Sequence, residues 1–323
     1  MATRTSRLTV TLCALAIVLS VSDGGTTPLQ DGGAVKPRPA GADAGARGTR
    51  PTPERNRPAP TASRIVSLVP AVTEMLFAIG AGPKVIAVSS FDTFPPEIRA
   101  LPQVGALIDP DTERILALRP DLVVTYGSQE DTRARFERAG IRTFAYRHGG
   151  LTAMLETMRQ VGAVTGRVAA AAEAAQRIQQ QLDGVRQRVR GRPRPTTLLV
   201  FERSPQTLRG IYASGGAGFL NEMLDYAGGA NVFADVRRES VQPSQETILM
   251  RAPQVILEIR ANALPGAGDA QRDREVWNTL ASVPAVRQKR VHFLAGSPLV
   301  VPGPRVAQGV EWMARALHPD AFR

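Results

Sequence analysis

A long helical pattern over residues 168–190 constrains this chain more than any other stretch. Val168, Ala171, Ala175 and Ile178 recur at three- and four-residue steps, and polar side chains occupy the other faces, as in an amphipathic helix. At 1.5 Å per residue, about 23 residues make a rod of roughly 35 Å, long enough to span a small domain. We therefore predict a rigid helix that joins two folded units. A long helix packed on a single sheet is the alternative.

The sequences on both sides of this helix alternate short apolar runs with helical patterns. Before it, strands are expected at 64–68, 85–88, 121–126 and 141–146, and helices at 73–81, 113–118 and 131–139. After it, strands are expected at 196–201, 254–259 and 290–294, and helices at 219–227, 245–251, 276–282 and 305–317. Such alternation predicts sheets of parallel strands covered by helices. The predicted fold class is α/β, with two Rossmann-like lobes of parallel-rich sheets, residues 63–150 and 192–323, joined by the helical segment 151–191.

The N-terminal residues have the pattern of an export signal. Arginines precede an apolar run that ends among small residues, which predicts a signal peptide over 1–22 cleaved near Ser22. The run is about 14 residues, too short to span a membrane comfortably. Leu12 stands before Cys13 where a lipoprotein signal needs a small residue, so we find no convincing lipobox. Residues 23–62 are rich in proline, glycine and alanine and predict a disordered tether.

Composition excludes several classes of chemistry. Cys13 is the only cysteine, so the mature chain would have no disulfide and no thiol nucleophile, which fits a bacterial periplasm. The formal net charge is +11, but the arginines are scattered among acids and aromatic residues are only 5%, so we expect compositional bias and no nucleic-acid partner.

One segment is repeated on the two sides of the long helix. Residues 113–124 align without gaps on residues 246–257: a glutamate opens each copy, Ile-Leu follows, and a proline precedes an apolar strand. Acidic residues favour the first turn of a helix, so Glu113 and Glu246 can be explained simply as good helix starters.

Catalytic signatures are missing from the sequence. There is no HExxH, P-loop or GxSxG motif, and the three histidines are far apart without ligand spacing. We therefore expect no enzyme, no catalytic residue, no metal site and no cofactor. A secreted hydrolase would need a triad that the sequence lacks, and a site for a bare metal ion would need several clustered ligands.

Aromatic and basic residues follow the predicted strands. Ligands of α/β sheets bind beyond the carboxyl ends of the strands, so the region between two such lobes is the expected ligand site. The candidate ligand-binding residues are Phe91, Phe94, Tyr126, Arg147, Arg203, Arg209, Tyr212, Arg260 and Ser297.

Several motifs together resemble the solute-binding proteins of ABC importers for vitamin B12, haem and iron–siderophores. The resemblance runs from about residue 64 to the C-terminus and rests on RIVSLVPAVTEMLFAIGAG (64–82), FDTFPPEI (91–98), LPQVG (101–105), DTERILALRPDLVVTY (111–126), YASGGAGFLNEMLDYAGGANVFAD (212–235) and SQETILMRAPQVILEI (244–259). It implies two α/β lobes joined by one rigid helix. It also implies that Glu113 and Glu246 dock into arginine pockets of a permease dimer in the inner membrane.

The vitamin B12-binding branch is the nearest resemblance. Phe91 and Tyr126 fall at aromatic positions of that branch, whereas Leu107 and Ser240 stand where it can carry tryptophan. The resemblance implies a periplasmic, monomeric protein that captures a metal chelate, expected to be a corrinoid, and delivers it to the permease. An iron–siderophore or haem is the alternative ligand, since arginines suit an anionic chelate. Because one long helix resists hinging, we predict small lobe movements on binding.

Overall fold

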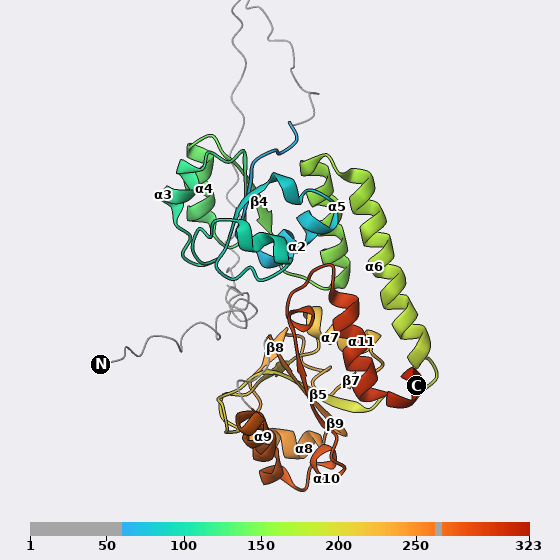
Figure 1. Ribbon diagram of the computed structural model, residues 1–323. Helices are drawn as coiled ribbons and strands as arrows, with labels where there is room; N and C mark the ends of the chain where they lie inside the picture. The colour runs from blue at the N-terminus through green and yellow to red at the C-terminus, as the bar shows by residue number, and fades with distance from the viewer. Residues whose placement is uncertain (1–59, 262–266) are drawn as a thin grey trace, which may run out of the picture.

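The computed structural model describes residues 60–261 and 267–323, which form two lobes, one above the other in Figure 1. The predicted signal peptide, residues 1–22, and the tether up to residue 59 lie outside the described residues. At the start of the described part, Ala62 is buried and its amide donates to the Val164 carbonyl at 2.8 Å. The predicted α/β class is confirmed.

The first lobe is built on a parallel four-stranded sheet in the order β2-β1-β3-β4. Its strands are β1 (Ile65–Ser67), β2 (Val85–Val88), β3 (Leu122–Tyr126) and β4 (Arg142–Tyr146). Its helices are α2 (Pro70–Ala78), α3 (Thr112–Ala117) and α4 (Glu130–Arg138), with 3-10 helices at Gly82–Lys84 and Pro96–Ala100. All carboxyl ends of the parallel strands therefore meet at one edge of this sheet.

The second lobe has a mixed sheet in the order β10-β9-β5-β6-β8, with β7 also paired to β5. Its strands are β5 (Thr196–Glu202), β6 (Tyr212–Ser214), β7 (Ala230–Asn231), β8 (Ser240–Val241), β9 (Val255–Arg260) and β10 (Val291–Ala295). Its helices are α7 (Gly218–Tyr226), α8 (Gln245–Arg251), α9 (Ala267–Glu275), α10 (Pro284–Arg287) and α11 (Val306–Leu317), with 3-10 helices at Val276–Leu280, Ser297–Leu299 and Pro319–Phe322. Strands β10, β9 and β5 are parallel, whereas β6 and β8 are antiparallel.

The connecting segment consists of two helices, α5 (Leu151–Thr165) and α6 (Val168–Val189). They are separated by Gly166, whose φ of 70° is a left-handed conformation that glycine adopts without strain. Helix α6 then runs along one side of the molecule from the first lobe to the second, where it contacts α11 (Figure 1). The predicted long helix is thus confirmed, and it joins two sheets.

Strand periodicity divides the core of the second lobe into two faces. Leu199 and Phe201 of β5 point into the core that also contains α6, α7 and α11, whereas Leu198 and Val200 point to the other side. The first of these cores continues through α5 and α6 into the first lobe as a single cluster of buried residues.

Two expectations for the second lobe need correction. The predicted helix over 276–282 is a 3-10 helix at Val276–Leu280, preceded by α9, which was not predicted. The antiparallel strands β6 and β8 also depart from the expected parallel pattern, because they are only three and two residues long and carry no clear periodicity.

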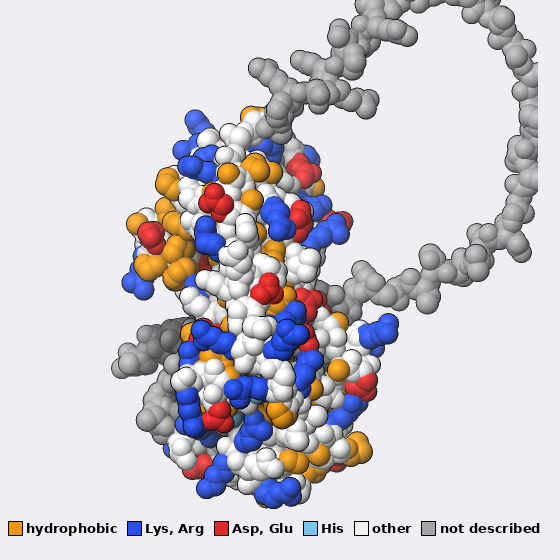
Figure 2. All heavy atoms as spheres, turned by 90° about the vertical axis from the view of Figure 1, so that its right-hand side faces the viewer, with side chains coloured by type: hydrophobic (Ala, Val, Ile, Leu, Met, Phe, Trp, Pro, Cys, Tyr) orange, Lys and Arg blue, Asp and Glu red, His pale blue; other side chains and the backbone are white. Residues whose placement is uncertain are grey.

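Basic side chains are spread over both lobes. In Figure 2, which shows the side carrying α6, lysine and arginine side chains are separated by acidic and apolar ones and form no single stripe. No helix within the described residues is long and apolar enough to cross a membrane.

Candidate functional site

Aromatic side chains collect at the carboxyl edge of the first sheet. Tyr126 and Tyr146 are the last residues of β3 and β4 and are register partners, so their side chains project from the same face. Their rings meet edge to face, with centroids 5.3 Å apart. Burial, together with the nearby Glu239 carboxylate of the second lobe, raises the pKa of Tyr126 to about 12. Phe91, in the loop after β2, is half-buried against the same core. This edge of the sheet is therefore a largely apolar surface next to the second lobe, and its Tyr126 hydroxyl is protonated.

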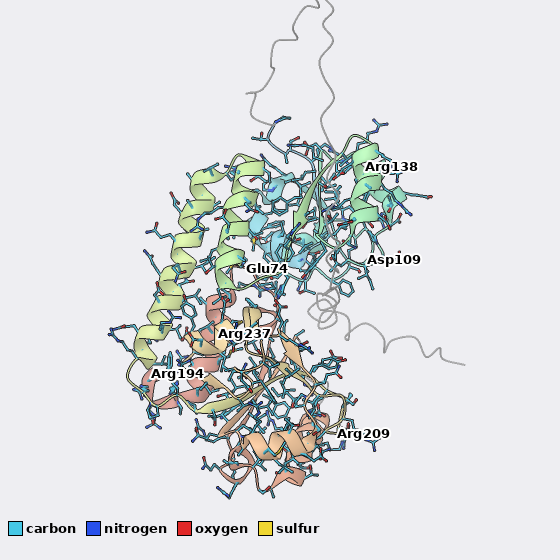
Figure 3. The ribbon with its side chains drawn as sticks, turned by 180° about the vertical axis from the view of Figure 1, so that it is seen from behind. Glu74, Asp109, Arg138, Arg194, Arg209 and Arg237 are labelled. Atoms are coloured by element: carbon cyan, nitrogen blue, oxygen red, sulfur yellow. The ribbon has the colours of Figure 1, made fainter. Side chains whose placement is uncertain are left out.

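An ion pair joins the two lobes beside this edge. Glu74 lies on α2 of the first lobe, and Arg305 immediately precedes α11 of the second. The Arg305 Nε donates to Glu74 Oε2 at 2.9 Å, and its Nη2 donates both to the other Glu74 oxygen and, at 2.9 Å, to Ser297 Oγ. The Arg305 guanidinium also stacks on the Phe94 ring, 3.7 Å from its centroid. Figure 3 labels Glu74 where the two lobes meet. Two predicted residues, Phe94 and Ser297, are therefore brought together from different lobes.

A second interlobe contact joins His148 to Glu239. His148 Nε2 lies 3.9 Å from Glu239 Oε2, and the His148 ring packs edge-on against Phe219 of α7. Burial lowers the pKa of His148, although the neighbouring Glu239 works in the opposite direction, so the imidazole is mainly neutral at pH 7. Within the part of the chain that the structure describes, Glu239 Oε2 is buried without a hydrogen-bond partner. The contact places an unsatisfied acceptor close to the tyrosines.

A buried carboxyl group, Asp92, lies in the loop after β2. The Ser89 amide and hydroxyl donate to Asp92 Oδ2 at 2.9 and 2.6 Å. Its other oxygen, Oδ1, is buried with no hydrogen-bond partner among the described residues. Burial raises the pKa of Asp92 to about 6 despite these hydrogen bonds, and the neighbouring Glu74 adds to the shift.

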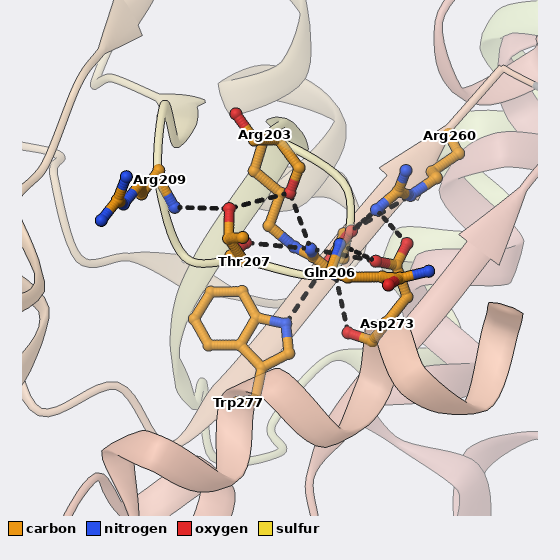
Figure 4. A network of polar contacts seen from close by, with 9 residues as sticks. Arg203, Gln206, Thr207, Arg209, Arg260, Asp273 and Trp277 are labelled. Atoms are coloured by element: carbon orange, nitrogen blue, oxygen red, sulfur yellow. Dashed lines mark hydrogen bonds and ion pairs between the residues drawn. The ribbon is translucent and has the colours of Figure 1, made fainter.

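Arg203 and Arg260, both predicted to bind ligand, take part in a charge network of the second lobe (Figure 4). The Arg203 side chain is 0% exposed; its Nε donates to Glu258 Oε2 at 3.0 Å and its Nη1 to Asp273 Oδ1 at 3.2 Å. Arg260 Nη2 donates to the second Asp273 oxygen at 2.9 Å and also pairs with Glu258. The Trp277 indole completes the network by donating to Glu258 at 3.0 Å. Both guanidinium groups neutralise buried carboxylates in this network, so in this structure they stabilise the second lobe.

The remaining candidates are separated from one another. Arg209 is exposed, and Figure 3 labels it on the second lobe away from Glu74. Tyr212 is half-buried, and the centroid of its ring lies 6.2 Å from the centroid of the Phe201 ring. Arg147 is exposed, and its side chain lies over Gly127, the residue that follows Tyr126. Of these three, only Arg147 adjoins the tyrosine edge.

The repeated segment has the same structure in both lobes. Asp111 and Ser244 cap α3 and α8 by accepting the amide three residues on, at 2.9 and 3.2 Å, and Glu113 and Glu246 are exposed at the second helical position. A hydrogen bond from Ser244 lowers the pKa of Glu246. The two glutamates thus occupy equivalent positions on different lobes.

Sequence reasoning missed six residues of this region, Glu74, Asp92, Tyr146, His148, Glu239 and Arg305. Tyr146 carried the same strand-end signal as Tyr126. Glu74, His148, Glu239 and Arg305 are isolated polar residues whose partners are distant in sequence. Across residues 60–261 and 267–323 we find no group of three or more His, Cys, Asp or Glu side chains that could hold a metal ion.

Comparisons with known proteins agree with this architecture. The profile of the family described as periplasmic binding protein matches residues 65–297. The vitamin B12-binding protein of Salmonella typhimurium is 30% identical over 242 residues, which cover 74% of this chain and 86% of that protein. Two solved structures have the same fold: the periplasmic vitamin B12-binding protein of Vibrio cholerae (TM-score 0.67, 24% identity, 81% of this chain and 99% of that one) and a periplasmic haem-binding protein of Roseiflexus (TM-score 0.66, 25% identity, 80% and 99%).

Proposed function

This chain belongs to the periplasmic binding protein family, which acts with ABC permeases, and we propose that it captures a corrinoid between its two lobes for import. The observation that carries the proposal is the aromatic edge of Tyr126, Tyr146 and Phe91, next to the second lobe. A broad macrocycle can bury a large apolar area against such an edge, while a few polar groups fix its orientation. The name of the Salmonella relative supports a corrinoid as that macrocycle.

In this proposal the protein works by binding and release, without a chemical step. Tyr126 stays protonated at any physiological pH, so its hydroxyl can donate a hydrogen bond to the ligand. The buried Glu239 oxygen can accept one from the ligand's amide groups. Entry of the ligand would replace the 3.9 Å contact of Glu239 with His148 by direct hydrogen bonds.

A calorimetric titration of the purified chain with cyanocobalamin, haemin and a ferric siderophore tests the proposal. We expect cyanocobalamin to bind in the sub-micromolar range, and Tyr126→Ala or Phe91→Ala to weaken it by roughly tenfold or more. Tyr226→Ala is the matched control, because this half-buried tyrosine packs under Arg186 beside α6. Preferential binding of another ligand, or equal loss in the control, would contradict the corrinoid assignment.

An anionic iron chelate or haem is the second candidate, and the exposed arginines near the lobe contact favour it. Arg147 adjoins Tyr126, and Figure 3 labels Arg237 on the second lobe near the level of Glu74. Both side chains are exposed. In the same titration, Arg147→Gln and Arg237→Gln would then weaken the siderophore or haemin and leave cyanocobalamin unaffected.

We further propose that Glu113 and Glu246 dock the two lobes onto a dimeric permease. Two exposed carboxylates at equivalent positions can pair with two symmetry-related basic sites and steer the approach. Reversing both charges with Glu113→Lys and Glu246→Lys is expected to abolish transport by reconstituted vesicles without changing ligand affinity. Unchanged transport by this variant would refute the docking role.

Export to the periplasm would deliver the protein to its permease. The N-terminal pattern of residues 1–22 supports export by a cleaved signal, and sequencing the N-terminus of the protein recovered from the periplasm tests it.

A further inference from the structure

Exposed apolar side chains concentrate around the two helices that carry the repeated glutamates. The large hydrophobic residues that are exposed within residues 60–261 and 267–323 are Ile108 (54%), Leu116 (36%), Val168 (63%), Leu249 (40%), Met250 (79%) and Trp312 (36%). Four of these six lie on α3, on α8 or in the loop just before α3. These helices are short, so the concentration does not follow from their length.

Each helix presents its apolar residues on the same face as its glutamate. Leu116 and Leu249 follow Glu113 and Glu246 by three residues, and Met250 follows Glu246 by four, spacings that place side chains together on a helix surface. The intervening isoleucines, Ile115 and Ile248, are 0% and 1% exposed and anchor the opposite faces in their lobes. The outward direction of these leucines is therefore fixed by packing.

We propose that Leu116 in the first lobe and Leu249 with Met250 in the second are the apolar halves of two matched contact patches for the permease. This inference rests on the proposed function, because it assigns further residues to the same docking event. Each patch joins a carboxylate to an adjoining aliphatic surface, and thus fits a basic residue beside an apolar hollow on the partner.

The duplication of the patch indicates what kind of partner binds it. The same residue pattern appears once on each lobe, at equivalent positions of the repeat, so a partner that contacts both must offer its complementary site twice. A permease dimer has this twofold repetition. The negative charge of each patch also matches basic residues better than an anionic membrane surface.

The two patches are unequal. Ala117 occupies the position in the first lobe that Met250 occupies in the second, and Met250 is the most exposed large hydrophobic residue within the described ranges. Methionine adapts its shape to a partner surface, so the second-lobe patch should contribute more to binding. The expected order of importance is Met250, then Leu249, then Leu116.

Binding to purified permeases tests the inference. Each ABC permease for this ligand class encoded by the source organism is placed with its ATPase in nanodiscs, and binding of the full mature chain is measured by interferometry at about 0.05 and 0.5 M salt. We expect Met250→Ser to raise Kd about tenfold and the triple variant Leu116→Ser, Leu249→Ser, Met250→Ser about thirtyfold at both salt concentrations. The effect of Glu113→Gln with Glu246→Gln should instead shrink at high salt, because it is electrostatic.

Val168→Ser is the matched control, since it removes an exposed apolar side chain at the start of α6, outside both patches. Wild-type affinity of the triple variant for a permease that binds the wild-type chain would overturn the inference and leave the proposed function standing. Failure of the wild-type chain to bind any permease of the panel would overturn the proposed function, and this inference with it. Sedimentation that shows a dimer of the wild-type chain, dissociated by the triple variant, would assign the patches to a second copy and overturn the permease assignment.

Discussion

The two lobes share a framework but bury their carboxylates in different ways. In both, a capped helix ends in a left-handed residue, a proline follows, and the next strand pairs in parallel with the first strand of its lobe. Asp121 and Gln254, eight residues after the repeated glutamates, even accept backbone amides from equivalent places, Arg64 and Thr196. In the second lobe, Glu258 and Asp273 are neutralised by Arg203 and Arg260 of the same lobe.

Within the described residues of the first lobe, the buried carboxylates Glu74 and Asp92 are not neutralised by a cation of the same lobe. Glu74 pairs with a cation of the other lobe, Arg305, and Asp92 accepts hydrogen bonds from Ser89, which is neutral. A buried carboxylate that lacks a local cation is costly when charged. The Glu258–Asp273 network of the second lobe is thus neutralised within that lobe, whereas Asp92 and Glu74 of the first lobe respond to pH and to the other lobe.

The largest expected effect comes from removing Arg203. Arg203→Met leaves Glu258 and Asp273 buried with only Arg260, and we expect the free energy of unfolding to fall by about 3–5 kcal/mol. Urea denaturation followed by circular dichroism measures it. Arg209→Met, on an exposed residue of the same loop, is the control and should change stability by less than about 0.5 kcal/mol. A loss below about 1 kcal/mol for Arg203→Met would contradict the claim that Glu258 and Asp273 depend on Arg203 for their neutralisation.

Asp92 should give the first lobe a characteristic pH dependence. Its pKa is raised from 3.8 to about 6, so the folded state binds more protons than the unfolded state between these values. The stabilisation is present below about pH 3.8 and is lost as the pH rises through 6, in total about 3 kcal/mol. Relative to the wild type, Asp92→Asn should therefore become more stable by that amount between about pH 4 and pH 7.5.

Urea titrations at several pH values measure this difference. Asp121→Asn is an informative control, because hydrogen bonds from Ser63 and Arg64 outweigh burial and lower the pKa of Asp121. Its variant should lose stability relative to the wild type as the pH rises toward 3.8 and should keep a constant difference above it, a slope of the opposite sign. Parallel curves for wild type and Asp92→Asn would show that Asp92 titrates normally.

The dependence of the first lobe on the second can be measured with a double-mutant cycle. Glu74→Gln, Arg305→Met and the double variant should give a coupling free energy of about 2 kcal/mol, since the pair is largely buried. The exposed pair Glu311–Arg315 on α11 is the control, with an expected coupling of about 0.3–0.5 kcal/mol. Equal coupling in the two pairs would mean that the interlobe ion pair adds nothing beyond a surface contact.

The smallest expected effect tests the equivalence of the two lobes. Arg119 and Ala252 adopt φ angles of 48° and 43° after the repeated helices, a conformation that favours glycine. Arg119→Gly and Ala252→Gly should each stabilise the protein by about 0.5–1 kcal/mol in thermal unfolding. Ala139→Gly, where φ is −84°, is the control and should not stabilise. If only one of the two variants were stabilised, the repeated segments would share their sequence pattern but not the same strained backbone.

Local periodicity was enough to predict most of the framework. The amphipathic pattern placed α6 to within one residue, and β2 and α8 have the predicted bounds, because each is set by residues close in sequence. Short strands such as β8 carry no periodicity and were missed.

The candidate site was only partly predictable, because its charges act over long sequence separations. Phe94 and Ser297, chosen from their positions after strands, both contact Arg305 where the two lobes meet. Arg203 carried the same signal, yet its partners are Glu258 and Asp273, 55 and 70 residues away. Glu74 and Arg305 are 231 residues apart, and nothing local to either indicates the other.

The single core cluster that runs from the first sheet through α5 and α6 to α11 has a mechanical consequence. Rotation of one lobe relative to the other must displace packed side chains along the whole cluster. Such a displacement costs free energy, so we expect the two lobes to resist it. Thermal motion alone should rarely spread the lobes far. A partner that contacts α3 on one lobe and α8 on the other would therefore have to exert force against this continuous core in order to move the two lobes apart.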